Sequence, residues 1–112
     1  MLLFFMKQAL GVFTKRVWEL AKSIPPGRVT TYGLLAVSAG GHPMQSQMIT
    51  HILSKCPDID QIPFHRIVYA GGKVWLSDKY AKKRLALYKK EGIRLDSKNK
   101  IIDFENIVFL FD

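Results

Sequence analysis

The sequence predicts a mostly α-helical fold with a small β component, a winged helix-turn-helix. Three observations predict it. Apolar residues recur at helical spacing before the break Pro25-Pro26-Gly27. Two short helical segments follow, separated by the Gly-Gly-His-Pro break at residues 40–43. Two short β-rich runs then flank a Gly-Gly turn at residues 71–72, as in the hairpin that forms a wing.

The first segment predicts an amphipathic helix over about residues 9–23, in which Phe13 and Val17 fall on one face. The preceding residues 1–6, MLLFFM, form an apolar run that is shorter than the roughly 20 residues of a transmembrane helix. The run also lacks the positive stretch that opens a secretory signal. We expect it either to extend the first helix or, if translation begins at Met6, to form a loose N-terminal extension.

The next segment predicts the two helices of the helix-turn-helix. Residues 28–30 read as a short extended link, and Thr31 has the side chain of an N-cap for a helix over about residues 32–39. A further helix is predicted over about residues 44–54, after the glycine-containing break. Its apolar side carries Met48, Ile49, Ile52 and Leu53.

The segment that follows predicts a loop and then the wing. Residues 56–63 read as an irregular loop, since they combine two prolines with polar residues. The β-rich runs at residues 66–69 and 73–76 are expected to pair as a hairpin across the Gly-Gly turn.

The last segment predicts one helix and a tail. The helix is expected over about residues 79–91, with Asp78 as its N-cap and Gly92 at its C-terminal end. The tail, residues 96–112, contains short apolar runs and is expected to form one or two short strands or extended segments on the core.

Composition bounds the function. The chain of 112 residues is 48% hydrophobic, which excludes a disordered protein and suits a single domain over residues 1–112. One cysteine excludes an internal disulfide and a cysteine-rich zinc site, so no metal is expected. The balance of 17 Lys+Arg against 9 Asp+Glu gives a net charge of +8. That charge indicates a polyanionic partner, either nucleic acid or an anionic membrane surface.

The distribution of charge favours nucleic acid. Residues 28–57 contain no acidic residue, so the two central helices expose amide and hydroxyl groups that can hydrogen-bond to phosphates and base edges. Residues 73–90 hold seven basic residues and one acidic residue, which form either a solvated helix face or a set of phosphate contacts. The candidate DNA-binding residues are Thr31, Gln45, Ser46, Met48, His51 and Lys73.

Two motifs together resemble a known family. The sequence Pro63-Phe64-His65-Arg66 precedes an Ile-Val pair, and Ile-Pro-Pro-Gly-Arg-Val-Thr-Thr-Tyr-Gly spans residues 24–33. From about residue 12 to residue 95 the chain resembles the DNA-binding domain of the alkylguanine-DNA alkyltransferases. Those enzymes carry a cysteine between the motif's proline and histidine, and this cysteine takes the alkyl group from a damaged guanine in one irreversible turnover.

Phenylalanine stands at the cysteine position of this chain. Phe64 has no lone pair to donate, so it cannot accept an alkyl group. The resemblance is therefore to the alkyltransferase-like proteins, which bind the alkylated base without repairing it and flag it for nucleotide excision repair. It implies a protein that is not an enzyme and has no cofactor, acting as a monomer on the minor groove of double-stranded DNA, away from membranes, in a cytoplasm or a nucleus.

The resemblance implies roles for individual residues. Phe64 would offer a flat wall to the flipped base, His65 would lose the proton relay and become structural, and Arg66 would order the pocket. Tyr32 matches the tyrosine that pushes the target nucleotide out of the stack, a step that costs a few kcal/mol. The implied lesion pocket comprises Pro63, Phe64, His65, Arg66, Tyr69 and Trp75.

Three positions depart from the family pattern. The family arginine that fills the gap left by the flipped base lies 17 positions before the reactive position, where this chain has Gln47. Glutamine can still intercalate but lacks the cation. Thr50 replaces a glycine of the same helix, and Tyr69 replaces the asparagine that follows the Ile-Val pair.

Other functions stay open at this point. Gln47 and Thr50 also suit a winged-helix DNA-binding protein without lesion specificity. Residual alkyl transfer would have to use Cys56, which lies outside the motif and is expected to be an inert buried thiol. Binding to a membrane surface through residues 1–7 and the basic helix is a further alternative, which only the positive charge supports.

Overall fold

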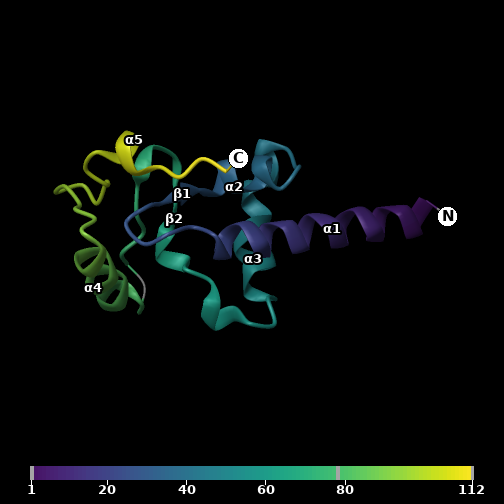
Figure 1. The fold of residues 1–112 in the computed structure, drawn as a ribbon, viewed down its shortest axis with the longest axis horizontal. Helices are drawn as coiled ribbons and strands as arrows, with labels where there is room; N and C mark the ends of the chain where they lie inside the picture. Colours follow the sequence, from purple (N-terminus) through teal and green to yellow (C-terminus); the bar gives the residue numbers. More distant parts are fainter. Residues whose placement is uncertain (1, 78, 112) are drawn as a thin grey trace.

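The computed structural model describes residues 2–77 and 79–111, with side chains described from residue 11 onward. It measures 52 × 26 × 22 Å because the first helix projects from the body (Figure 1). The helices and strands are α1 (Leu2–Lys22), β1 (Thr30–Thr31), α2 (Tyr32–Ser38), α3 (Ile49–Ser54), β2 (Ile67–Val68), α4 (Ala81–Glu91) and α5 (Phe104–Ile107). Short 3₁₀ turns lie between them: η1 (Pro43–Met48), η2 (Ile59–Gln61), η3 (Phe64–Arg66) and η4 (Ala70–Gly72).

Helix α1 confirms the predicted amphipathic helix and extends it towards the N-terminus. The apolar run continues the helix from Leu2, as the first of the two alternatives expected. Phe13 and Val17 are buried and Lys22 ends the helix just before the two prolines. Among the described residues, no helix is long and apolar enough to cross a membrane.

Two apolar clusters form the core. One lies where α1, α2 and α3 meet, and Val17, Leu35 and Leu53 are fully buried in it. The other joins the strands to α4 and the tail, and includes Val29, Val68 and Tyr88. The strand pair β1–β2 passes between them, since Val68 belongs to one cluster and Ile67 to the other.

The first helix of the predicted helix-turn-helix is confirmed as α2, whereas the second differs from the prediction. Thr31 caps α2 as predicted, because its Oγ1 accepts the Leu34 N–H at 3.0 Å. The helix expected over residues 44–54 divides into the 3₁₀ turn η1 and the short α3. A local cap explains the tight turn: the Gln45 side chain accepts the His42 backbone N–H at 2.6 Å.

The predicted wing hairpin is wrong. The strand β2 pairs in parallel with β1, Thr30 opposite Ile67 and Thr31 opposite Val68. Lys73 instead forms an isolated antiparallel bridge with Lys100. The reason is burial on both faces: both residues of β2 are buried, whereas a surface hairpin would expose alternate side chains. One hydrogen bond, from Tyr69 N–H to the Lys73 carbonyl at 2.9 Å, closes the turn.

The last helix and the tail follow the prediction in part. Helix α4 ends at Gly92 in the left-handed conformation, as expected, whereas the predicted cap Asp78 lies outside the described residues. The tail holds the short helix α5, which was not predicted, before it runs extended. Val29 pairs with Val108, and the extended tail then runs towards α2 (Figure 1). Phe109 packs against the first cluster.

One buried hydroxyl gives a stability test. Thr30 is fully buried, and among the described side chains its Oγ1 has no hydrogen-bond partner. We expect Thr30→Val to raise the free energy of unfolding by about 1 kcal/mol, because valine has the same shape and no polar group to desolvate. Urea denaturation measures the change.

The neighbouring threonine is the matched control. Thr31→Val removes the N-cap of α2 and is expected to lower the free energy of unfolding by about 1 kcal/mol. Two changes of the same sign would contradict the assignment of an unsatisfied and a satisfied hydroxyl.

Candidate nucleic-acid interface

A buried ionic cluster underlies the site. The carboxylate of Glu91 at the end of α4 accepts two hydrogen bonds from Arg66, at 2.8 and 3.0 Å, and one from the Gly27 N–H at 2.9 Å. His65 Nε2 lies 2.6 Å from the same carboxylate. Arg66 also donates to the Ile24 carbonyl at 2.9 Å. The cluster therefore joins the loop after α1, the turn η3 and the end of α4.

The charge states of the cluster follow from these contacts. Burial alone would raise the pKa of Glu91, but the hydrogen bonds from Arg66, Gly27 and His65 outweigh it and hold the pKa at about 2. Burial lowers the pKa of His65, and the neighbouring carboxylate offsets only part of that effect. Burial therefore favours the neutral form of His65, and a neutral imidazole facing the ionised Glu91 carboxylate donates to it through Nε2–H.

The turn η3 points Phe64 and His65 in opposite directions. Phe64 is 36% exposed, whereas His65 is 8% exposed and faces the ionic cluster. The Tyr88 hydroxyl donates to the His65 carbonyl at 2.6 Å, which fixes the backbone of the turn. The buried partners of His65 and Arg66 thus hold the phenyl ring of Phe64 outward.

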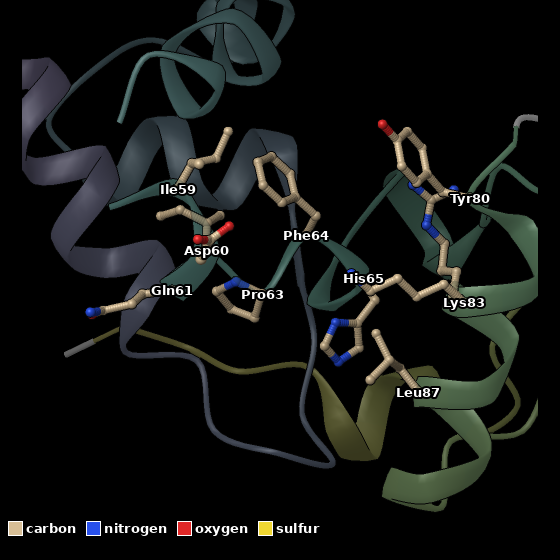
Figure 2. A pocket seen from close by; sticks show the side chains of 11 residues that line it. Ile59, Asp60, Gln61, Pro63, Phe64, His65, Tyr80, Lys83 and Leu87 are labelled. Atoms are coloured by element: carbon tan, nitrogen blue, oxygen red, sulfur yellow. The ribbon is translucent and has the colours of Figure 1, made fainter. Parts of the chain in front are cut away.

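Phe64 forms part of an open cleft of about 760 Å³. Figure 2 shows the ring between Ile59 on one side and Tyr80 with Lys83 on the other. The wall also contains Asp60, Gln61, Ile62, Pro63, His65, Arg84 and Leu87. We call this the phenylalanine cleft. It combines an apolar floor with cationic side chains from α4.

A second, smaller cleft of about 180 Å³ lies beside the start of α2. Tyr32 and Tyr69 meet in it with ring centroids 5.4 Å apart, and the exposed Trp75 adds a third ring. Burial raises the pKa of Tyr32, and the neighbouring Thr50 side chain offsets part of that effect. We call this the aromatic cleft; its other lining residues are Thr50, Ile67, Val68, Lys73, Val74, Arg84 and Tyr88.

The structure thus divides the residues expected to form one lesion pocket. Pro63, Phe64 and His65 line the phenylalanine cleft, and Tyr69 and Trp75 line the aromatic cleft. Arg66 is not among the described lining residues of either cleft, since its guanidinium is bound to Glu91 and to the Ile24 carbonyl.

The candidate DNA-binding residues lie mainly on η1 and α3. Gln47, Met48 and His51 are exposed there, and Lys73 is exposed beside the aromatic cleft. Gln45 and Ser46 are half-buried, and Gln45 is engaged in the cap of η1. Thr31 is buried as the cap of α2, so its side chain supports the interface from within.

Cys56 lies apart from both clefts. Its thiol is buried and donates to Asp58 at 3.0 Å, and Asp58 pairs with Lys22 at 2.5 Å. Burial raises the pKa of the Cys56 thiol, which disfavours the thiolate that alkyl transfer needs. Within the described part of the chain, no group of three His, Cys, Asp or Glu side chains is placed to hold a metal ion.

The comparison with family models matches residues 12–93 to the 6-O-methylguanine DNA methyltransferase, DNA binding domain. The match covers most of the chain and includes both motifs and the ionic cluster. The chain belongs to this alkyltransferase family. Within the family it resembles the alkyltransferase-like branch, as its motif predicts.

Individual relatives agree with the assignment. The chain is 30% identical over 89 residues to the DNA base-flipping protein of Escherichia coli K12, covering 80% of this chain and 68% of the relative. It is 36% identical over 62 residues to the methylated-DNA–protein-cysteine methyltransferase of Methanosarcina acetivorans, covering 55% and 39%. The fold is similar to that of S. pombe Atl1 in complex with damaged DNA containing O6-carboxymethylguanine, with a TM-score of 0.69, 20% identity, and coverage of 87% and 94%.

Sequence reasoning missed the part that two residues play in this alkyltransferase-family site. The predicted helix ends at Glu91, but nothing in the spacing shows that its carboxylate reaches back to His65 and Arg66. Arg84 lines both clefts and donates to the Trp75 carbonyl at 2.5 Å. The sequence does show an excess of basic residues on α4. That excess indicates positive charge near DNA, but it does not show that Arg84 lies between the two clefts.

Proposed function

We propose that this chain binds double-stranded DNA, rotates an alkylated guanine out of the base stack and holds it against Phe64 without transferring the alkyl group. The observation that carries the proposal is a half-exposed phenyl ring, with no nucleophilic atom, held at a cleft by the buried histidine–glutamate–arginine cluster of an alkyltransferase frame. Stacking of a base on an aromatic ring is worth roughly 1–3 kcal/mol, and an alkyl group adds apolar contact.

The face that would meet the duplex is polar and free of acidic residues. Gln47, Met48 and His51 are exposed along η1 and α3, next to the aromatic cleft that contains Tyr32. In this proposal Gln47 fills the gap left by the extruded base and Tyr32 pushes on the adjacent phosphate. The protein bound at the lesion would then recruit the proteins of nucleotide excision repair.

Fluorescence anisotropy tests the proposal with two duplexes that differ only in one O6-methylguanine. We expect tighter binding to the methylated duplex and no loss of the methyl group. Phe64→Ala should reduce the affinity for the methylated duplex by about 5- to 150-fold, the value of one stacked base, with a smaller change for the ordinary duplex. The control variant is Leu110→Ala, because Leu110 is 64% exposed and lines neither cleft.

A second candidate function is DNA binding without lesion specificity. Gln47 favours it, because glutamine lacks the cation that the family arginine brings to the gap left by a flipped base. In that case both duplexes bind equally, the affinity falls steeply with salt, and Tyr32→Ala leaves it nearly unchanged. Equal affinities would exclude the first proposal.

A further inference from the structure

We propose that Arg84 is a positioning residue, which ties the Trp75 segment (residues 73–77) to α4 and so keeps the aromatic cleft at a fixed place relative to Phe64. The inference rests on the proposed function, in which Tyr32 extrudes a nucleotide at one cleft and Phe64 holds its base at the other. It adds a residue that lies outside both sequence motifs. Arg84 acts here through Trp75, and it needs no contact with DNA for this role.

Arg84 lies between the two clefts. It belongs to the first turn of α4, is half-buried, and is the single described residue that lines both clefts. Burial is the main cause of the raised pKa of Tyr32 and of the lowered pKa of His65, and the charge of the Arg84 guanidinium acts to lower the pKa of both groups. The guanidinium is therefore close enough to each cleft to hold one in place relative to the other.

A hydrogen bond joins the Trp75 segment to α4. The Arg84 guanidinium donates to the Trp75 carbonyl at 2.5 Å. On its other side the segment is held by the tail, because the Val74 N–H donates to the Asn99 carbonyl at 2.9 Å. The side chain of Trp75 is 56% exposed, so packing of the ring does little to hold the segment. The backbone attachments carry that task, and Arg84 supplies the attachment to α4.

The attachment affects lesion preference because the proposed function uses both clefts at once. An extruded nucleotide meets Tyr32 and Phe64 together, whereas a nucleotide that stays in the stack does not. Without the hydrogen bond from Arg84, the Trp75 segment would have to be ordered when the lesion binds, and that ordering reduces the affinity. Removing the bond should therefore weaken binding of the methylated duplex more than binding of the ordinary duplex.

The free protein gives the first test, in which DNA plays no part. The chain has two tryptophans, so Trp18→Phe leaves Trp75 as the single tryptophan. In that background we expect Arg84→Met to lower the fluorescence anisotropy of Trp75, because methionine cannot donate to the carbonyl. Arg84→Lys should keep the anisotropy near the parent value, since an ammonium group can still donate. An unchanged anisotropy in folded Arg84→Met would overturn the proposal.

Binding of the two duplexes gives the second test. We expect Arg84→Met to weaken binding of the duplex with O6-methylguanine by about 2- to 10-fold, the net value of one hydrogen bond, and to change the ordinary duplex less. Arg84→Lys should recover most of that loss. The matched control is Lys82→Met, because Lys82 is an exposed cation of α4 that lines neither cleft. It should change both duplexes equally, as the loss of a distant charge does.

The outcomes separate this inference from the proposed function. A parent protein that binds both duplexes equally would refute the proposed function, and the inference would fall with it. If the parent prefers the methylated duplex and folded Arg84→Met keeps that preference, the inference alone is refuted. An equal loss of affinity for both duplexes would show an effect of charge only and would refute it as well. Circular dichroism and urea unfolding check that each variant is folded.

Discussion

Replacing Glu91 with alanine is expected to lower the free energy of unfolding by about 3–5 kcal/mol, the usual effect of removing one partner of a buried ion pair. The side chain of Glu91 is 6% exposed and that of Arg66 is 17% exposed. The variant would leave the arginine charge and the Gly27 N–H buried without their acceptor. Urea denaturation of the parent and the variant measures the difference.

Two controls separate charge from packing. Glu91→Gln retains the volume of the side chain and should lose less than Glu91→Ala. The double variant Arg66→Met, Glu91→Leu should recover part of the loss, because an apolar pair needs no compensation of charge. If Glu91→Ala lowers the free energy of unfolding by less than about 1 kcal/mol, the Arg66–Glu91 pair contributes no more than an exposed ion pair does. That result would contradict its description as a buried ion pair.

The Glu91 carboxylate also makes the stability of the fold depend on pH in the acid range. Since the pKa of Glu91 is about 2 in the folded chain and 4.5 without its neighbours, its contribution is complete above pH 4.5 and is lost as the pH falls towards 2. We expect Glu91→Gln to flatten the fall in stability over that window. A parent and a variant with parallel pH profiles would contradict the lowered pKa.

Gly72→Ala is expected to lower the free energy of unfolding by about 2–5 kcal/mol, for two additive reasons. Gly72 has a φ of +90°, which costs an alanine about 1–2 kcal/mol. Its Cβ would also lie 2.8–3.1 Å from three atoms of Phe104, and overpacking of that kind costs about 1–3 kcal/mol. Thermal or urea unfolding measures the effect.

The adjacent glycine separates the two causes. Gly71 has a φ of +75°, but the nearest atom to an added Cβ is the Lys100 Nζ, 3.9 Å away. Gly71→Ala should therefore show only the backbone effect of about 1–2 kcal/mol. If Gly71→Ala and Gly72→Ala lower the free energy of unfolding equally, Phe104 can move away from an added Cβ. That result would contradict close packing of Phe104 against Gly72 in the turn η4.

Local patterns predicted much of the fold. The helical spacing around Phe13 and Val17 and the capping chemistry of Thr31 depend on neighbours in sequence, and both predictions are confirmed. The wing failed because β2 takes its partner from β1 and not from across the nearby turn. Alternation within a short run cannot show that both faces are buried, so a parallel strand and a hairpin strand look alike in sequence.

The candidate site was predicted as a set of residues but not as a geometry. The motif placed Phe64, His65 and Arg66 together, yet the opposite directions of the first two arise from the 3₁₀ turn and from Glu91, 25 residues beyond Arg66. The division into two clefts depends on tertiary packing around Arg84. Side chains joined by long-range contacts carry no periodic signal.

The contacts of Glu91 also fix when the interface can first exist during synthesis. Its carboxylate meets the Gly27 N–H across 64 residues of sequence. A chain emerging from the ribosome can form α1 and α2 early, but the turn below Phe64 stays without its buried acceptor until α4 has been made. At roughly 5–20 residues per second, the nascent protein spends several seconds with its first helices made and the contacts below Phe64 still unformed. The geometry around Phe64 is thus completed only once α4 has been made, later than the residues of η1 and α3.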